Sequence, residues 1–452
     1  MDTVAKTVTS KKNINEYLKE ESQKTQLKFL TCGSVDDGKS TLIGRLLFET
    51  GSVPESELKT LAKDSQKFGT TDNHYDFALL VDGLASEREQ GITIDVAYRY
   101  FATPKRKFIV ADTPGHEQYT RNMATGASNC DAAVIMLDAS KGLLTQTRRH
   151  SFIVSLLGIK HVIVAVNKMD LIDFSEEKYC ALCDDYINFS KTLGFESTTL
   201  IPISAMRGDN ITSVSASMPW YKGSVLLTHL EQLAPQVENS EPFALSVQLV
   251  NRPNQNFRGY AGRVNSGSIS PGDSIRVFPS GKVSTVKEIV TFEGNKQLAV
   301  AGESVTLTLT DELDISRGNV LTCHQSPCEV ANQFQTTLLW MSETSLVVSR
   351  QYVLQLANQS MLATPVKLKH RIEIGTLKKA SANNLKQNDF GVCELMVSKP
   401  LSFKPYKTSK TFGGFILIDR LTNETVACGW IDFALRRAAN IYHHAETISP
   451  LE

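Results

Sequence analysis

GSVDDGKS, at Gly33–Ser40, sets the architecture of the first part of this chain. It directly follows an apolar segment that contains Phe29 and Leu30, and it fits the pattern G-x-x-x-x-G-K-[ST]. In this pattern the glycines let backbone N–H groups wrap around phosphates, the lysine reaches the β- and γ-oxygens, and the hydroxyl approaches Mg²⁺. The stretch predicts a phosphate-binding loop, with contacts from Gly33, Ser34, Val35, Asp36, Asp37, Gly38, Lys39 and Ser40.

A second motif, DTPGH at Asp112–His116, follows the apolar run Phe108–Val110. An aspartate at this place can hold Mg²⁺ through water, and the glycine N–H can report whether a γ-phosphate is present. The histidine is placed to orient an attacking water, because an imidazole can accept its hydrogen bond. We expect nucleotide contacts from Asp112, Thr113, Pro114, Gly115 and His116.

Two short motifs further along the chain predict that the base is guanine. Asp170, in Asn167–Asp170 (NKMD), can accept hydrogen bonds from the N1–H and the exocyclic amine of guanine, donors that adenine does not present in that geometry. Asn167 is expected to tie the base loop to the phosphate loop, and the Lys168 stem to lie along the base. A backbone N–H of Ser204–Ala205 is expected to meet guanine O6. The predicted base-loop residues are Asn167, Lys168, Met169, Asp170, Ser204 and Ala205.

The segment EREQGITID, Glu87–Asp95, lies between the first two motifs. A threonine in a mobile loop can coordinate Mg²⁺ while the γ-phosphate is bound and release it after hydrolysis. Thr93 is the candidate. The predicted metal site is therefore Ser40, Thr93 and Asp112, and the predicted catalytic residues are His116, Lys39 and Thr93.

Hydrophobic patterning divides the chain into an α/β part and a β-rich part. Short apolar runs alternate with helical patterns as far as residue 225, which predicts a doubly wound, mostly parallel sheet. Turn-rich alternation follows a linker near Pro235–Pro242 and predicts two β-barrels. The expected domains are an N-terminal extension 1–24, a GTPase domain 25–235, barrels 242–325 and 329–442, and a C-terminal tail 443–452.

Composition adds three expectations. Lys plus Arg and Asp plus Glu both number 48, and this zero net charge gives no support for a broad nucleic-acid or anionic-membrane surface. The first 25 residues lack an apolar signal region and the apolar runs are too short to span a membrane, so a cytoplasmic protein is expected. The run Arg148–His150 is expected on a solvated helix face.

Together these motifs resemble the translation-factor class of GTPases, which carry a GTPase domain followed by two β-barrels. GSVDDGKSTLIGRLLFE, ALLVDGLASEREQGITIDVAYRYF, ADTPGHEQYTRNMATGAS and MPWYKG are similar, more narrowly, to the large GTP-hydrolysing subunit of bacterial sulfate adenylyltransferase. That resemblance implies GTP and Mg²⁺ as cofactors and a separate small subunit that transfers adenylyl from ATP to sulfate. The GTPase subunit would couple GTP hydrolysis to this uphill step.

Other readings stay open at the level of sequence. An elongation-factor-like GTPase that carries aminoacyl-tRNA shares the three-domain plan, and so does a stress or assembly GTPase. Some relatives of the sulfate-activating family continue into an adenylylsulfate kinase domain with a phosphate-binding loop of its own. No second loop of this pattern occurs here, so kinase activity is expected to be absent.

Overall fold

The first part of the chain is built on one six-stranded sheet. The computed structural model describes residues 24–68, 75–81, 93–234, 241–325 and 328–435. Five strands run parallel and the edge strand β2 is antiparallel to its neighbour, which confirms the predicted doubly wound sheet. Across the sheet the order is β2 (Ala97–Ala102), β3 (Arg106–Asp112), β1 (Thr25–Cys32), β4 (Ala132–Asp138), β5 (His161–Asn167) and β6 (Ser197–Pro202).

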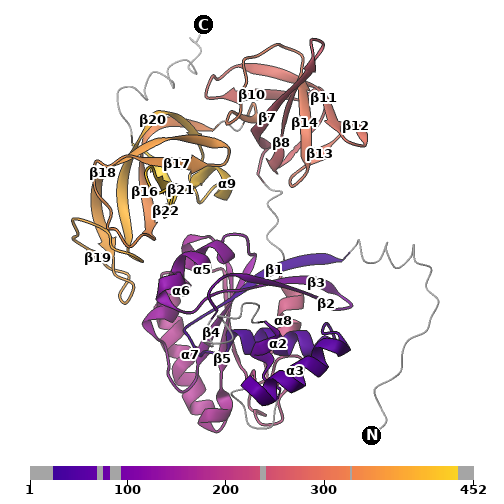
Figure 1. Cartoon of the computed structure of the whole chain (residues 1–452), viewed down its shortest axis with the longest axis vertical. Coiled ribbons are helices and arrows are strands. Elements are labelled where there is room, and N and C mark those ends of the chain that lie inside the picture. The colour runs from indigo at the N-terminus through magenta and orange to yellow at the C-terminus, as the bar shows by residue number, and fades with distance from the viewer. Residues whose placement is uncertain (1–23, 69–74, 82–92, 235–240, 326–327, 436–452) are drawn as a thin grey trace, which may run out of the picture. The chain divides into compact units, whose positions relative to one another are not determined.

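Helices cover both faces of this sheet (Figure 1). One face carries α5 (Thr120–Ala127), α6 (Thr145–Leu156) and α7 (Glu176–Ser190). The other carries α2 (Lys39–Glu49) and α8 (Leu226–Gln232), and α3 (Glu55–Phe68) contacts the segment Phe77–Leu80 beside α2. A strand covered on both sides reads as a nearly continuous apolar run, and β4, AAVIMLD, is buried along its whole length and apolar up to its last residue.

Polar residues appear where the parallel strands end. Asp112, Asp138 and Asn167 are the last residues of β3, β4 and β5, and all three are buried. Short 3-10 helices follow at Glu117–Tyr119 (η2) and Met169–Ile172 (η3), while Phe77–Leu80 (η1) packs beside α2. Ligands of doubly wound sheets bind at the carboxyl ends of the strands, so the fold gathers these residues at one edge.

The chain divides into two compact units between Pro235 and Gln236, and the second unit contains two closed barrels. In the first barrel, pairing between β10 and β11 closes a ring of six strands, and β12 (Gly294–Lys296) extends β11. β9 (Ser268–Ile269) and β13 (Ala299–Val300) form a separate pair. The ring consists of β7 (Ala244–Asn254), β8 (Phe257–Ser266), β10 (Ser274–Phe278), β11 (Val283–Thr291), β14 (Ser304–Leu309) and β15 (Val320–Cys323).

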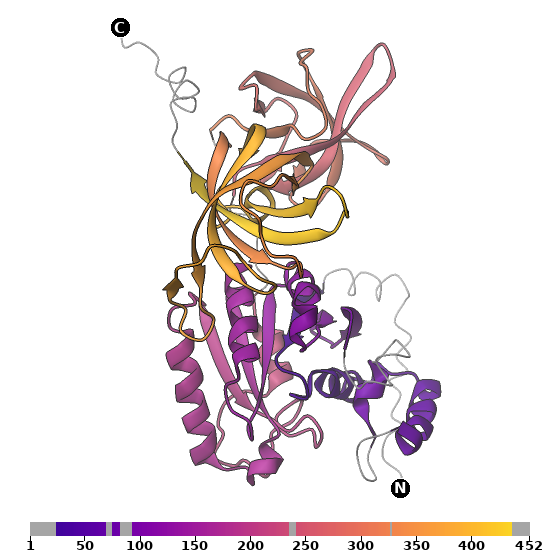
Figure 2. The same cartoon turned by 60° about the vertical axis from the view of Figure 1, so that its left-hand side comes forward.

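The second barrel closes in the same way, through pairing of β17 with β18, so both predicted barrels are confirmed. Its strands wrap around an apolar core (Figure 2). The elements are β16 (Glu329–Trp340), β17 (Tyr352–Leu356), β18 (Gln359–Ile372), β19 (Lys379–Ala380), β20 (Phe390–Phe403), α9 (Lys410–Gly413), β21 (Gly414–Asp419) and β22 (Thr425–Ala434).

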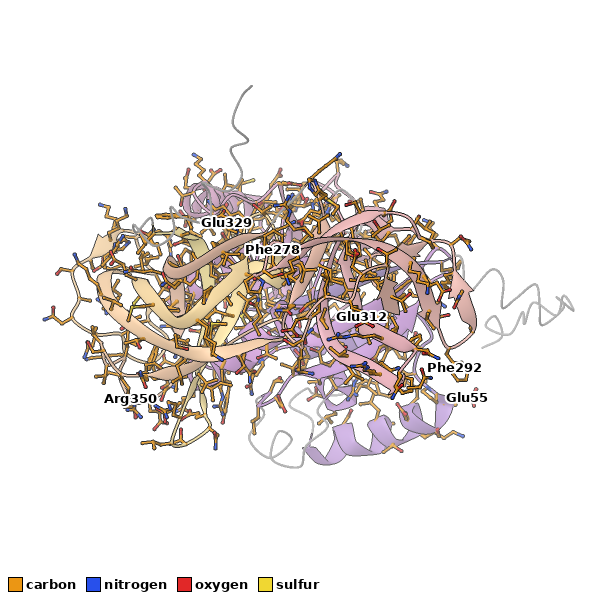
Figure 3. The ribbon with its side chains drawn as sticks, turned by 90° about the horizontal axis from the view of Figure 1, so that it is seen from above. Glu55, Phe278, Phe292, Glu312, Glu329 and Arg350 are labelled. Carbon is orange, nitrogen blue, oxygen red and sulfur yellow. The ribbon has the colours of Figure 1, made fainter. Side chains whose placement is uncertain are left out.

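The two barrels share a small apolar cluster. Phe412 of α9 packs with Phe278 and Val320 of the first barrel. Beside it, the Asn358 amide donates to the Ser246 hydroxyl at 2.9 Å. By contrast, Phe292 lies fully exposed between β11 and β12 (Figure 3).

Two expectations from the sequence fall at the ends of the chain. The N-terminal extension 1–24, apart from its last residue, and the tail 443–452 lie outside the described residues, as does most of the segment Glu87–Asp95. Within the described ranges, no helix combines the length and apolar character needed to cross a membrane.

Candidate functional site

The phosphate loop connects β1 to α2 in a conformation that its sequence permits. Gly33 and Gly38 have φ of +149° and +90°, values that favour glycine. Asp36 also has a positive φ, which aspartate tolerates better than most residues. The Ser34 N–H donates to Asp37 Oδ2 at 2.6 Å, so the Asp37 side chain braces the loop from inside. Burial raises the pKa of Asp37, and Lys39 opposes that shift.

Lys39 lies between the phosphate loop and the DTPGH segment. Its ammonium donates to the Ser34 carbonyl at 2.7 Å, and burial lowers its pKa although Asp112 and Asp37 oppose this. A Cβ placed on Gly115 would lie 2.6 Å from Lys39 Nζ and 2.8 Å from the Ser34 carbonyl carbon. Only a glycine lets the second motif approach the loop this closely.

The three residues predicted to hold a metal come together from three separate segments. Ser40 Oγ donates to Asp112 Oδ2 at 2.8 Å and lies 3.3 Å from Thr93 Oγ1. The Thr31 hydroxyl donates to the other Asp112 oxygen at 3.2 Å. The fold thus places two hydroxyls against one buried carboxylate at the start of α2.

This oxygen set fits Mg²⁺ bound together with nucleotide phosphates. Mg²⁺ prefers oxygen ligands and is usually held by one or two carboxylates plus phosphates and water rather than by a closed protein cage. The described part of the chain has no group of three or more His, Cys, Asp or Glu side chains arranged to hold a metal.

His116 is half-buried at the beginning of η2. Its Nδ1 accepts the Gln118 N–H at 3.3 Å and so caps this short helix. While Nδ1 accepts, the neutral ring carries its proton on Nε2, which can donate to a water or phosphate oxygen but cannot accept. To accept a hydrogen bond from water, as the sequence suggested, the ring must release the cap.

The base-loop residues surround the end of β5. Asn167 is buried, and its amide donates to the Asp37 carbonyl at 2.7 Å while its oxygen accepts the Ala205 N–H at 2.9 Å. This is the expected tie between the base and phosphate loops. The Asp170 carboxylate is half-buried and accepts no hydrogen bond from the described residues.

Lys168 pairs with Asp138, at the end of the neighbouring strand β4, over 2.9 Å. Burial raises the pKa of Asp138, but hydrogen bonds from Ser140 and from Lys168 outweigh it and leave the pKa below its ordinary value. The Lys168 ammonium, whose stem is expected to lie along the base, is therefore held by the buried Asp138 carboxylate. Asp138 was not predicted, although it ends its strand just as Asp112 does.

The loop after β6 uses the two N–H groups that the sequence assigned to guanine O6. The Ser204 N–H donates to the Asp209 carbonyl at 3.3 Å, and the Ala205 N–H donates to Asn167. The next donor, the Met206 N–H, has no acceptor within the described residues. The segment Ala205–Met206 is therefore where the loop can offer a backbone donor to a ligand.

His150 contradicts the expectation of a solvated run at Arg148–His150. It is fully buried in α6, and its Nδ1 accepts the N–H of Gly33 at 3.0 Å. Burial, with Lys39 and Arg149 nearby, lowers the pKa of His150 to about 3. A neutral histidine thus accepts a hydrogen bond from the first glycine of the phosphate loop. No local sequence motif predicts this contact.

Comparison with known proteins identifies the scaffold. Residues 24–239 match the elongation factor Tu GTP-binding domain, 260–322 match elongation factor Tu domain 2, and 333–432 match the GTP-eEF1A C-terminal domain-like family. Sulfate adenylyltransferase subunit 1 of Shewanella woodyi is 52% identical over 93% of this chain and 89% of its own length. The chain belongs to the sulfate adenylyltransferase subunit 1 family.

Two further relatives show the extent of the match. Subunit 1 of Aeromonas hydrophila is 50% identical over 99% of this chain and 94% of its own length. The bifunctional enzyme NodQ of Rhizobium sp. is 51% identical over 97% of this chain and 68% of its own length. The family resemblance read from the motifs is confirmed, and the GTP-binding domain, β-barrel order and subunit designation all agree with it.

Proposed function

We propose that this chain is the GTP-hydrolysing subunit of a sulfate adenylyltransferase. It couples hydrolysis of GTP to formation of adenosine 5′-phosphosulfate and pyrophosphate from ATP and sulfate, the first step of sulfate activation. The observation that carries the proposal is the identity of about half of all residues with sulfate adenylyltransferase subunit 1 over nearly the whole chain. The GTP-binding domain supplies the hydrolytic half of this activity.

The proposed nucleotide contacts follow from the geometry of the loops. Backbone N–H groups of Gly33–Ser40 and the Lys39 ammonium bind the phosphates, while Asp170 binds the guanine edge. Ser40, Thr93 and Asp112 would hold Mg²⁺, which supplies charge neutralisation on the β- and γ-phosphates. Gly115 lies against Lys39, so its N–H is close to where a γ-phosphate would bind.

His116 is proposed to position the water that attacks the γ-phosphate. As long as it caps η2 through Nδ1, the ring offers an Nε2–H donor, and release of the cap frees Nδ1 to accept a hydrogen bond from water. The same side chain can therefore switch between holding its own loop and orienting water. The Thr93 contact to Ser40 would change with it when the γ-phosphate leaves.

The partner in this proposal is the small catalytic subunit that performs adenylyl transfer. The subunit designation of the relatives supports a hetero-oligomer. We place the complex in the cytoplasm, with neither a nucleic acid nor a membrane as partner. The balanced charge of 48 basic and 48 acidic residues gives no support for a broad nucleic-acid or anionic-membrane surface.

The test is GTP hydrolysis by this chain together with the small subunit, with and without ATP plus sulfate, while pyrophosphate release is followed. Faster hydrolysis with both substrates, and adenylylsulfate above its GTP-free level, is the expected result. GTP turnover that ignores both substrates and partner would reject the pathway but keep the GTPase. GTP-dependent retention of aminoacyl-tRNA on a filter would favour the elongation-factor alternative instead.

A further inference from the structure

Arg45, on the second turn of α2, reaches across to the loop that follows β6. Its Nε donates to the Ala205 carbonyl at 3.1 Å, and its Nη2 donates to the Met206 carbonyl. Ala205 and Met206 lie 160 and 161 positions after Arg45 in the chain. The helix that begins at the phosphate loop therefore also carries a side chain that holds the proposed guanine loop.

The guanidinium has two further partners beside the carbonyls. Its centre lies 4.3 Å above the Phe77 ring, and Glu49 pairs with it one turn along α2 at 3.6 Å. Glu49 in turn accepts a hydrogen bond from Thr212, at the far end of the same loop. Because a guanidinium is planar, it can stack on the ring and direct two donors at neighbouring carbonyls at once.

In the loop after β6, Gly208 lies close to the ion pair of Arg45 and Glu49. Gly208 has φ of +90°, and a Cβ there would lie 2.6 Å from Glu49 Oε1 and 3.7 Å from the Arg45 guanidinium carbon. A larger residue at this place would displace the contacts just described. Arg45, Glu49 and Gly208 thus form one latch, which we call the loop latch.

The latch determines where the loop directs its backbone donor. A trans peptide points its C=O and N–H in opposite directions, and the Ala205 carbonyl is held on the Arg45 side. The Met206 N–H of the same peptide consequently points away from α2, and it has no acceptor within the described residues. The Ser204 and Ala205 N–H groups already donate to Asp209 and Asn167. Of these three neighbouring N–H groups, that of Met206 is therefore the one that can donate to a ligand.

We propose that Arg45 is the positioning residue for recognition of guanine O6: by holding the Ala205 and Met206 carbonyls, it fixes the backbone donors of this segment relative to the phosphate loop. The inference deepens the proposed GTPase function and rests on it. Arg45 itself touches neither base nor phosphate. Its effect is on base selectivity rather than on the hydrolytic step.

The test compares three nucleotides in equilibrium binding to the full chain. GTP and ITP both carry O6, whereas 2-aminopurine riboside triphosphate lacks it. We expect Arg45→Met to weaken GTP and ITP by the same factor, about tenfold, which is the size of one positioned hydrogen bond. Binding of the 2-aminopurine nucleotide should change less than about twofold. Arg45→Lys should behave like Arg45→Met, because an ammonium cannot span both carbonyls while stacked on Phe77.

Arg106→Met is the matched control. Arg106 is a buried arginine of the same unit that also donates to two carbonyls, those of Leu230 in α8 and of Leu233 just after it, outside the nucleotide loops. The Arg106→Met variant should lower the stability of the chain. The ratio of its affinities for GTP, ITP and the 2-aminopurine nucleotide should stay as in the wild type. Equal losses for all three nucleotides in Arg45→Met, or no loss for any, would overturn the inference alone. A wild-type chain without preference for GTP over ATP would overturn the proposed function as well.

Discussion

At the scale of single residues, burial determines what the histidines can do. His150 is enclosed between α6 and the phosphate loop and stays neutral, whereas His116 is half-buried at the start of η2. A neutral ring can accept the Gly33 N–H through Nδ1, and a charged ring cannot. The phosphate loop is therefore held by a residue whose protonation would break the contact.

This burial makes stability depend on pH. The pKa of His150 is about 3 in the folded chain and about 6.5 when unfolded, so between these values only the unfolded state binds the proton. Stability is then complete above pH 6.5 and falls as the pH decreases, by up to about 1.4 kcal/mol per pH unit. Urea unfolding at pH 7.5 and 5.5 should show a loss of about 1.4 kcal/mol that disappears in His150→Asn.

The asparagine oxygen can still accept the Gly33 N–H, so this variant removes the titration and keeps the contact. An unfolding free energy whose pH dependence is the same in wild type and variant would contradict the assigned pKa. Other titrating groups, His229 among them, contribute equally to both proteins and cancel in the comparison.

His116 is proposed to do more than cap η2, since its imidazole would also orient the attacking water. His116→Ala should lower the rate of GTP hydrolysis about 100-fold, the lower end for a positioned acid or base, with GTP affinity changed less than about threefold. His116→Asn provides the control, since its side-chain oxygen can still cap η2 but it has no second ring nitrogen. Single-turnover hydrolysis at saturating GTP measures the effect. Normal turnover in the asparagine variant would reject the ring as the water-positioning group.

At the scale of elements, α2 links three parts of the site. Its first turn holds Lys39 and Ser40, its second turn carries Arg45, and its last residue, Glu49, pairs with Arg45. A straight helix advances about 1.5 Å per residue, so the spacing between phosphate loop and loop latch is set by the helix itself. Packing of η1 against this helix then holds it in place.

Gly44 makes that packing possible. A Cβ at this position would lie 2.0 Å from the Phe77 carbonyl oxygen, so η1 and α2 must separate to admit it. Gly44→Ala should lower the free energy of unfolding by about 1–3 kcal/mol, the cost of overpacking. On an uncrowded helix the same change would be stabilising by up to about 1 kcal/mol.

Denaturant unfolding distinguishes these signs directly. Gly375→Ala serves as the control, because a Cβ there meets nothing within 4 Å and its stability should change less than about 0.5 kcal/mol. A stabilised Gly44→Ala chain would mean that α2 and η1 do not touch in solution.

At the scale of the whole molecule, the chain forms two compact units, and the barrels of the second unit share an apolar cluster. Phe412 is buried in this cluster and contacts the first barrel from an element of the second. Its position predicts a stability effect in the barrel unit that leaves nucleotide binding untouched.

Phe412→Ala should lower the unfolding free energy of the second unit by about 3–5 kcal/mol, the usual cost of removing a buried phenylalanine. GTP affinity should stay within about twofold, since every proposed nucleotide contact lies in the first unit. Phe292→Ala, at a fully exposed position, is the control and should change stability by less than about 0.5 kcal/mol. Unfolding of the two units can be followed separately by calorimetry. A loss of GTP binding in Phe412→Ala would contradict the proposal that all nucleotide contacts lie in the first unit.

Sequence by itself determined the parts of this protein whose chemistry is local. The Gly33–Ser40 loop can be recognised from consecutive residues alone, and the apolar patterns predict the sheet and the two barrels that the structure shows. Asp112 and Asn167 could be placed as well, because the carboxyl ends of parallel strands meet at one edge.

Only the tertiary structure decided the contacts between distant segments. His150 lies 117 positions from Gly33, and Arg45 lies 160 from Ala205, so no spacing rule connects either pair. In the sequence, His150 belongs to a charged run and Arg45 is an ordinary helix arginine. Their roles arise from tertiary packing, which brings the buried His150 ring to one backbone N–H and the Arg45 guanidinium to two backbone carbonyls.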